Sequence, residues 1–326
     1  MPQDNNSKKK YLTDYNKSDL DWDIHKASTD KISYFYHTSF NSNHHKYSQR
    51  MDSCAELLRF NFVDDIDTGE SKLKLNQASF CRVRLCPVCQ WRRSMAWRGR
   101  MFNKLPSLLE EHPEYEFIFL TLTVKNCSIT SLASTLEDMN KAWNRLRLRK
   151  EFKHIQGFLR ATEVTKGGDG SAHPHFHTIL VVKKSYFQGR YYIKTSQWAE
   201  VWQQCLKVDY LPICDVRKVK KQAKGQGLEV KAICELLKYT TKIKDLLDDQ
   251  TWFLELSDQL YKKRFLASGG CLKDMLKEDT SNQEMIIGDS SSDELEQDEL
   301  KKKSLYFGWE QQVKKYKKVK NPYTGN

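Results

Sequence analysis

Two kinds of pattern alternate along the middle of the chain. Runs of β-branched and aromatic residues predict strands, and apolar residues repeated every three or four positions predict helices. The predicted strands lie at residues 117–124, 157–165, 173–182 and 213–219. The predicted helices lie at residues 131–152, 196–206 and 229–247. The elements therefore follow one another in the order β-α-β-β-α-β-α.

This order predicts an α+β fold, with an antiparallel sheet of split ferredoxin-like type and helices on one face of the sheet. The sequence KGGDGS at residues 166–171 separates the second and third strands, and its glycines indicate a tight loop. We expect these two strands to fold back on each other as a hairpin.

The segments outside this series differ in composition. Residues 1–50 are polar, rich in Asn, Ser, Lys and Tyr, and are expected to be flexible. Residues 51–110 hold a cluster of cysteines and arginines, and the predicted sheet and helices occupy residues 111–275. Residues 276–326 combine an acidic stretch, typical of a linker, with a lysine-rich tail that is expected to be mobile.

The charge of the chain indicates a polyanionic partner. The net charge is +12, although nine acidic residues and no Lys or Arg lie between Glu278 and Glu299. The remainder is therefore more basic than the total shows, which favours nucleic acid. There is no apolar run of 18 residues and no signal peptide, so we expect a cytoplasmic protein without a membrane partner. The nine cysteines then favour thiols or metal ligands over disulfides.

Three histidines, His173, His175 and His177, occupy alternate positions in the third predicted strand. Strand side chains alternate between faces, so the three imidazoles share one face. A lone histidine there would be an ordinary core residue, but a His-x-His pair is harder to bury because each ring needs partners for its nitrogens. The hairpin can bring Glu163 beside the pair, although an exposed edge-strand position is the alternative for this residue. Two histidines and a carboxylate would hold a divalent cation with positions open to a phosphate.

The last predicted helix contains ELLKYTTK, which places Glu235, Tyr239 and Lys242 on one side of it. Taken alone, this stripe is consistent with a solvated helix face. Beside a metal-bound phosphate the tyrosine acquires a chemical use, because a phenol activated by a cation or a base is a nucleophile. The lysine can orient the phosphate or stabilise charge, and the carboxylate can activate a water molecule.

The cysteines predict a second metal site. Cys81, Cys86 and Cys89 are close in the sequence, and Cys54 can supply a fourth thiolate for structural zinc. Buried free thiols and a redox-active Cys-x-x-Cys pair are the alternatives. Arginines interleaved with tryptophan in the same region are expected to contact DNA phosphates and to stack on bases. The residues of this predicted surface are Arg82, Arg84, Arg92, Arg93 and Trp91.

These blocks resemble the His-hydrophobe-His endonucleases, most closely the replication initiators of rolling-circle plasmids from Gram-positive bacteria. The sequence FLTLTV is similar to the first motif of that family, PHFH to its metal motif, and ELLKYTTK to its catalytic block. The three blocks occur in the order of the family, and the resemblance extends over residues 54–274.

The resemblance implies a site-specific single-strand endonuclease and strand transferase, with its endonuclease core at residues 111–275. By this resemblance Tyr239 nicks one strand at a plasmid origin and keeps the 5′-phosphate. Glu235 then activates water at termination, and Lys242 assists at the phosphate.

The same resemblance implies a Mg²⁺ or Mn²⁺ ion held by His175, His177 and Glu163. His173 lies outside the usual histidine pair. The implied partners are plasmid origin DNA, in double-stranded and single-stranded form, together with a host helicase and DNA polymerase.

Two other functions are considered. A conjugative relaxase or a transposase of the same superfamily would use the same chemistry, but relaxases usually carry the tyrosine before the histidines and this chain carries it after them. A zinc-containing DNA-binding regulator would need no catalysis, which leaves the histidine, glutamate and tyrosine blocks without a use.

Overall fold

The computed structural model describes residues 9–64, 71–189, 191–219, 243–276 and 304–323. The chain divides into two compact units. One unit comprises residues 94–278, and the other combines residues 1–93 with residues 279–326. None of the helices within the described ranges has both the length and the apolar character needed to cross a lipid bilayer.

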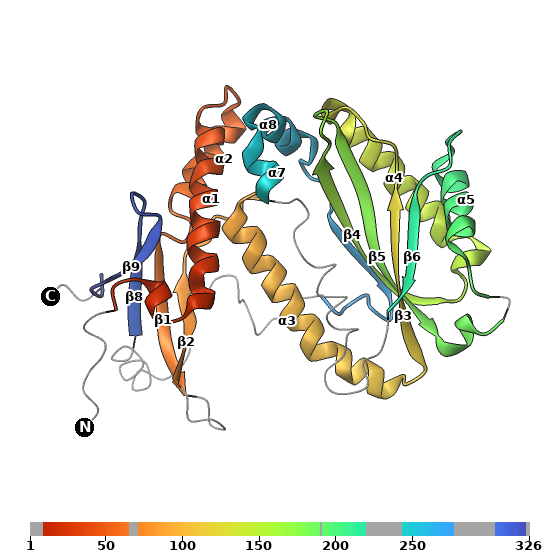
Figure 1. Ribbon diagram of the computed structural model, residues 1–326, viewed down its shortest axis with the longest axis horizontal. Coiled ribbons are helices and arrows are strands. Elements are labelled where there is room, and N and C mark those ends of the chain that lie inside the picture. Colours follow the sequence, from red (N-terminus) through yellow and green to blue (C-terminus); the bar gives the residue numbers. More distant parts are fainter. Residues whose placement is uncertain (1–8, 65–70, 190, 220–242, 277–303, 324–326) are drawn as a thin grey trace. The chain divides into compact units, whose positions relative to one another are not determined.

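The unit of residues 94–278 is built on a five-stranded sheet (Figure 1). The strands lie in the order β6-β3-β5-β4-β7, and every pairing is antiparallel. Their bounds are β3 Tyr115–Thr123, β4 Ile155–Lys166, β5 Ala172–Lys183, β6 Cys214–Lys218 and β7 Leu266–Gly270. β4 and β5 form the hairpin expected around KGGDGS, and β5 is the central strand.

Two helices, α4 (Leu132–Arg147) and α5 (Thr195–Leu206), pack on one face of this sheet (Figure 1). The contact is aromatic, because the ring of Phe176 on β5 lies 6.3 Å from that of Trp143 on α4 and 6.2 Å from that of Trp202 on α5. Side chains alternate along β5, so the neighbours of Phe176 on the strand project from the opposite face.

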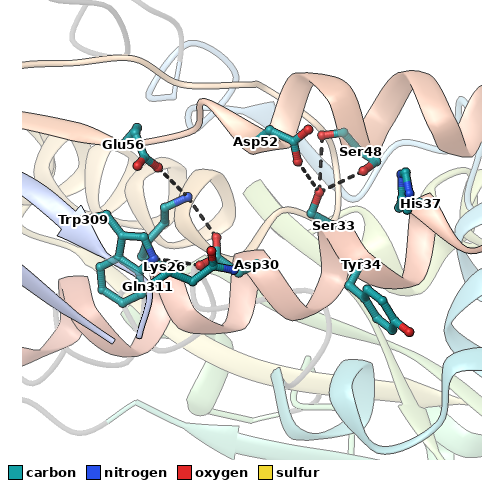
Figure 2. Close-up of a pocket in the computed structure, with 10 residues that line it drawn as sticks. All are labelled: Lys26, Asp30, Ser33, Tyr34, His37, Ser48, Asp52, Glu56, Trp309 and Gln311. Carbon is teal, nitrogen blue, oxygen red and sulfur yellow. Dashed lines mark hydrogen bonds and ion pairs between the residues drawn. The ribbon is translucent and has the colours of Figure 1, made fainter. Parts of the chain in front are cut away.

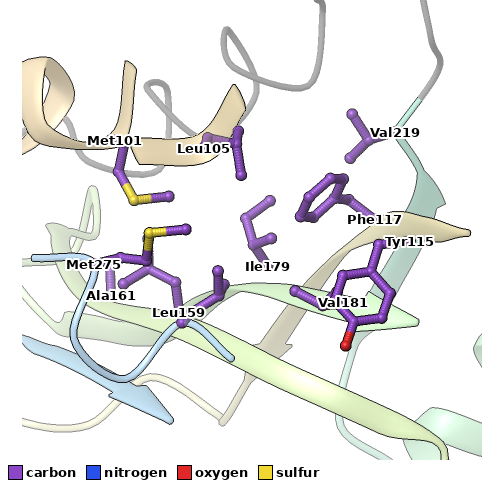
Figure 3. Packing of buried hydrophobic residues seen from close by; sticks show 11 residues of the cluster. Met101, Leu105, Tyr115, Phe117, Leu159, Ala161, Ile179, Val181, Val219 and Met275 are labelled. Carbon is purple, nitrogen blue, oxygen red and sulfur yellow. The ribbon is translucent and has the colours of Figure 1, made fainter. Parts of the chain in front are cut away.

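The opposite face is covered in part by α3 (Pro87–Glu111). Met101 and Leu105 of this helix are fully buried against Phe117 of β3 and Ile179 of β5 (Figure 3). The apolar half of this face is therefore occupied by α3, while the histidines occupy its other end.

The order β-α-β-β-α-β predicted up to residue 219 is present, and the α+β class is confirmed by two antiparallel sheets combined with helices. The final predicted helix, residues 229–247, falls mostly outside the described residues. Only α7 (Ile243–Asp248) overlaps it, and α8 (Gln250–Gln259) follows. Strand β7, which adds an edge beside β4, was not expected from the sequence, because LASGG has two glycines and little β-branched content.

The other unit holds a four-stranded antiparallel sheet in the order β2-β1-β8-β9. Its strands are β1 Leu57–Asp64, β2 Ser71–Ala78, β8 Ser304–Glu310 and β9 Lys315–Val319. One face of the sheet is apolar, since the ring of Phe60 lies 5.9 Å from that of Phe307 and 6.4 Å from that of Trp22 on α1 (Leu20–His37).

The expectation of a flexible segment at residues 1–50 is wrong for the part described from residue 9 onward, where α1 and α2 (Ser42–Asp52) lie. Some of the charged side chains that make this segment polar are buried in the fold. Lys26 is 1% exposed and forms ion pairs with Asp30 at 2.9 Å and Glu56 at 3.4 Å. Because these charges are paired, they are tolerated on a buried helix face. Composition alone does not show that such charged residues are buried.

The expectation of a mobile lysine-rich tail is also wrong for residues 304–323. β8 pairs with β1, and β9 pairs with β8. Tyr306, Phe307 and Tyr316 are buried, so the aromatic residues among the lysines anchor this segment to the sheet.

Candidate metal centres

The histidines and Glu163 meet in the middle of the five-stranded sheet. The register pairs Glu163 of β4 with His175 of β5, and Thr121 of β3 with His177 of β5. A register slip of one residue would turn Glu163 to the other face, so the alignment of the hairpin decides whether the cluster exists.

The carboxylate of Glu163 joins the two imidazoles. Its Oε2 atom lies 2.9 Å from Nε2 of His177 and 3.3 Å from Nε2 of His175. Burial raises the pKa of Glu163, but hydrogen bonds and charge from both histidines outweigh it and lower the pKa to about 2. The carboxylate is therefore ionised at neutral pH, as a metal ligand must be.

The other ring nitrogens have partners of their own. Nδ1 of His175 lies 3.2 Å from the carbonyl oxygen of His173, which can only accept, so Nδ1 holds the proton and Nε2 is left for a cation. Nδ1 of His177 lies 3.2 Å from Oγ1 of Thr121. Nδ1 of His173 instead lies 2.7 Å from Oδ1 of Asn126, so its ring is committed outside the cluster.

Thr121 and Asn126 were not identified from the sequence. Strand alternation in FLTLTV places Thr121 on the face that carries the histidines. The sequence pattern could therefore have identified Thr121, but only with β3 aligned against β5. Asn126 lies beyond the end of β3, where no periodicity applies.

The spacing of the three groups fits a divalent cation. Their ligand atoms all lie within 4.8 Å of one another. Metal–ligand distances of about 2.1 Å place neighbouring octahedral ligands about 3.0 Å apart, close to the 2.9 and 3.3 Å between the carboxylate oxygen and the ring nitrogens. The side chain of His177 is 25% exposed, which leaves the cluster accessible to a substrate.

A second cluster, of four cysteines, lies in the other unit. Cys54 follows α2, Cys81 follows β2, and Cys86 and Cys89 lie at the start of α3. The Sγ atom of Cys54 lies 3.7 Å from that of Cys86 and 3.7 Å from that of Cys89. The Sγ atoms of Cys81 and Cys89 are 3.6 Å apart. Sulfurs in a disulfide lie about 2.05 Å apart, and every described cysteine is free. The cluster could therefore bind a metal ion.

Backbone N–H groups point toward these sulfurs. The nitrogen of Cys81 lies 3.5 Å from Sγ of Cys54, and that of Val83 lies 3.4 Å from Sγ of Cys81. Arg82, which lies between Cys81 and Val83 in the chain, adopts a left-handed φ of 56°. This conformation costs a residue other than glycine about 1 kcal/mol, and it turns the N–H of Val83 toward the sulfur. Hydrogen bonds of this kind stabilise a charged thiolate.

Trp91 does not form the base-stacking surface expected from the sequence. It is only 7% exposed, and its ring stacks on His25 at 4.7 Å and meets Trp22 edge-on at 4.8 Å. The guanidinium group of Arg92 lies over the same two rings, 5.4 Å from that of Trp22 and 5.7 Å from that of Trp91. The prediction for Trp91 is wrong because helical periodicity turns it into the core.

The other arginines keep the character expected of a phosphate-binding surface. Arg82 is exposed, and Arg84 and Arg93 are half-buried. Burial and the positive charge of Arg93 lower the pKa of Arg84. Contact of these arginines with DNA stays a prediction.

Glu235, Tyr239 and Lys242 lie in residues 220–242, outside the described part of the chain. The residues that follow are held near the histidine cluster. Oδ2 of Asp245 accepts a hydrogen bond of 3.3 Å from the backbone nitrogen of Lys166, which lies at the end of the strand that carries Glu163.

The chain was compared with known proteins. A family model described as "Replication protein" matches residues 72–317. "Protein rep" of Streptococcus pneumoniae is 37% identical over 256 residues, which cover 76% of this chain and 78% of that protein. "Protein rep" of Bacillus amyloliquefaciens is 37% identical over 273 residues, 77% of this chain and 76% of that protein. "Replication protein" of Staphylococcus aureus is 33% identical over 195 residues, 56% of this chain and 83% of that protein. No solved structure matches the chain significantly.

The fold and its clusters define an α+β protein with two candidate metal centres, one of His and Glu and one of Cys. The chain belongs to the replication protein family. The resemblance to plasmid replication initiators is thereby confirmed.

Proposed function

We propose that this protein nicks one strand of a plasmid origin through a covalent 5′-phosphotyrosine, and so initiates and terminates rolling-circle replication. The observation that carries the proposal is the convergence of one carboxylate and two imidazoles, from Glu163, His175 and His177, on a single point of an accessible sheet face.

The strand arrangement supports the same class of enzyme. We propose that β3, α4, β4, β5, α5 and β6 form a split unit of ferredoxin-like type, and the strand order β6-β3-β5-β4, in which the first and second strands flank the third, supports this proposal. α4 and α5 lie on one face, and the proposed nicking site lies on the other.

A divalent cation, Mg²⁺ or Mn²⁺, held by these three side chains would polarise a phosphate oxygen of the scissile bond. The phenol oxygen of Tyr239 attacks the phosphorus and forms the phosphotyrosine bond. The bond between phosphorus and the 3′ oxygen breaks, the tyrosine gives up its proton, and the leaving oxygen gains one to become the 3′-OH. Lys242 neutralises charge at the phosphate, and Glu235 activates the water that ends the reaction.

The four cysteines are proposed to hold a structural Zn²⁺ ion. Four thiolates at about 2.3 Å from a tetrahedral zinc lie about 3.8 Å apart, which agrees with Sγ separations of 3.6 and 3.7 Å. The proposed partners are origin DNA, in double-stranded and single-stranded form, and a host helicase. A host DNA polymerase that extends the 3′-OH is also proposed.

The proposal is tested by incubating the full-length protein with a supercoiled plasmid that carries its cognate origin, in the presence of Mg²⁺ or Mn²⁺. The expected product is open-circular plasmid with protein attached to one 5′ end. Tyr239→Phe should give no adduct, whereas the control Tyr261→Phe, at an exposed position outside the motifs, should nick normally. Origin binding by the wild type without any nick would refute the proposal.

A further inference from the structure

Two cavities among the described residues of the unit that contains the four cysteines are equal in size, each of about 410 Å³. The first is lined by the carboxylates of Asp30, Asp52 and Glu56 (Figure 2). Its polar groups already bind one another, since the hydroxyl of Ser33 donates to Asp52 at 2.9 Å and Lys26 pairs with Asp30 and Glu56. Three carboxylates against one lysine make this cavity repulsive to a polyanion.

The second cavity has a different lining. The register aligns Gln77 of β2, Arg59 of β1 and Tyr306 of β8 in one row across the sheet. This row projects from the face opposite the Phe60–Phe307 core, because side chains alternate along each strand. Phe80 and Tyr323 also line the cavity, and Tyr323 is 71% exposed.

We infer that the second cavity binds a single unpaired base of a DNA strand, an inference that rests on the proposed function. The rings of Phe80 and Tyr323 offer planar surfaces on which a base can stack. The amide of Gln77 offers both a donor and an acceptor to the edge of a base, and the guanidinium of Arg59 offers further donors.

The charges around the cavity favour this ligand. In the strand register Lys74 lies opposite Asn61 of β1, so alternation puts this exposed lysine on the same face as Arg59. Lys317, opposite Gly308 of β8, lies on that face as well but forms an ion pair of 3.0 Å with Glu310. Glu56 is the one carboxylate among the residues that line the second cavity; it shares Lys26 with Asp30, and Arg59 supplies a positive charge in the same cavity. A strand whose base enters the cavity therefore has cations on the same face of the sheet for its phosphates.

The geometry also selects unpaired DNA. A base that enters the cavity and stacks on Phe80 or Tyr323 has left the stack of its own duplex, so only an extruded or single-stranded base can bind there. The cavity would thus hold the melted strand of the origin while the histidine site acts on that strand.

The test measures binding of the full-length protein by fluorescence anisotropy, without added divalent metal. The two probes are a fluorescein-labelled 12-nucleotide single strand of mixed sequence and a strand of equal length in which every base is replaced by an abasic tetrahydrofuran unit. Tyr323→Ala should weaken binding to the first strand by roughly tenfold and leave binding to the abasic strand unchanged. Gln77→Ala should act in the same direction.

The matched control is Tyr34→Ala, which removes a 61% exposed tyrosine that lines the first, acidic cavity. It should alter neither affinity. Unchanged binding of the base-bearing strand by both Tyr323→Ala and Gln77→Ala would overturn the inference, as would an equal loss on both probes, which would indicate a phosphate contact instead.

Nicking of the origin plasmid by the same preparations separates this inference from the proposed function. If the wild type nicks but Tyr323→Ala and Gln77→Ala both bind the base-bearing strand normally, the base pocket alone is rejected. If the wild type forms no nick, the proposed function is rejected, and the anisotropy comparison then shows a base pocket in a protein of another activity.

Discussion

A single hydrogen bond decides which nitrogen of His175 can meet a cation. The carbonyl oxygen of His173 accepts the hydrogen bond from Nδ1, so Nε2, 3.3 Å from the oxygen of Glu163, is the nitrogen that would give its lone pair to a cation bound between the two groups. His173 thus contributes its backbone rather than its ring. This division distinguishes the three histidines, which the sequence presents as equivalent.

We expect His175→Ala and His177→Ala each to lower nicking by roughly 100-fold or more, because each removes a ligand of the cation. His173→Ala keeps the carbonyl and should stay within about threefold of the wild type on this argument. Gel assays of plasmid nicking measure the rates, and gel-shift assays on duplex origin DNA check that binding is retained. Loss of nicking in His173→Ala equal to that in His177→Ala would show that its ring takes part.

Tyr239 and Glu235 should act at different times. Tyr239→Phe removes the nucleophile and should abolish the covalent adduct. Glu235→Ala removes only a base for water, so the first nick should survive, while termination slows by about 10²–10⁴-fold and over-long products accumulate. Denaturing gels that follow the adduct and the product length measure both steps. A folded Glu235→Ala protein that fails at the first nick would assign Glu235 to activation of Tyr239.

The sequence predicted Glu163, His175 and His177 because alternation and a short hairpin loop constrain all three at once. It failed for Trp91, because an aromatic residue between arginines has the same composition in a DNA-binding surface and in a helix with a buried face. Only the packing of Trp91 on His25 and Trp22 distinguishes the two cases.

At the scale of elements, the two candidate metal centres are built in different ways. The Glu–His cluster belongs to two adjacent strands whose register is fixed by backbone hydrogen bonds. The cysteine cluster instead joins the ends of three separate elements, α2, β2 and α3, which no sheet register holds together. A metal bound there would link these three ends directly.

Removal of that metal should therefore destabilise the protein. We expect Cys86→Ser, or treatment with a zinc chelator, to lower the melting temperature by roughly 10 °C or more. Differential scanning calorimetry measures the shift, and Cys127→Ser, at a half-buried cysteine of the other unit, is the control. Freshly purified active protein that contains no zinc by elemental analysis would refute the structural role.

Elements were predictable where the hydrophobic period within the segment itself indicates a strand or a helix, as in the series from β3 to β6. They were not predictable where burial depends on distant partners. α1 is stabilised by the ion pair of Lys26 with Glu56 and by packing of Trp22 on the sheet, and β8 pairs with β1 from more than 240 residues away. Neither relation leaves a local periodic signal.

At the scale of the whole molecule, the excess of basic residues should govern affinity for DNA. Each phosphate neutralised by Lys or Arg releases condensed counterions. Arg59 and Lys74 on the exposed face of the four-stranded sheet, and Arg82 near the cysteine cluster, are among the described residues that could contact phosphates.

Duplex origin binding should weaken steeply with salt. If about six phosphates are contacted, the plot of log K against log salt concentration should have a slope near −5. Titrations by fluorescence anisotropy between low and moderate salt measure it, and Arg82→Ala should make the slope less steep by about one unit if this residue contacts a phosphate. A slope close to zero would place the positive charge away from the DNA.

The sheet that joins β1 to β8 has a consequence for the order in which the protein is made. The five-stranded sheet draws on residues 115–270, a continuous stretch that leaves the ribosome before β8 exists. β1 and β2 are the first strands to emerge. The edge of β1 that pairs with β8 stays unpaired until residues 304–319 are synthesised. The unit of residues 94–278 can thus fold on the nascent chain, while the unit with the four cysteines closes only after residues 304–319 have emerged. Prematurely terminated copies would carry the histidine site without the completed sheet beside the inferred base pocket.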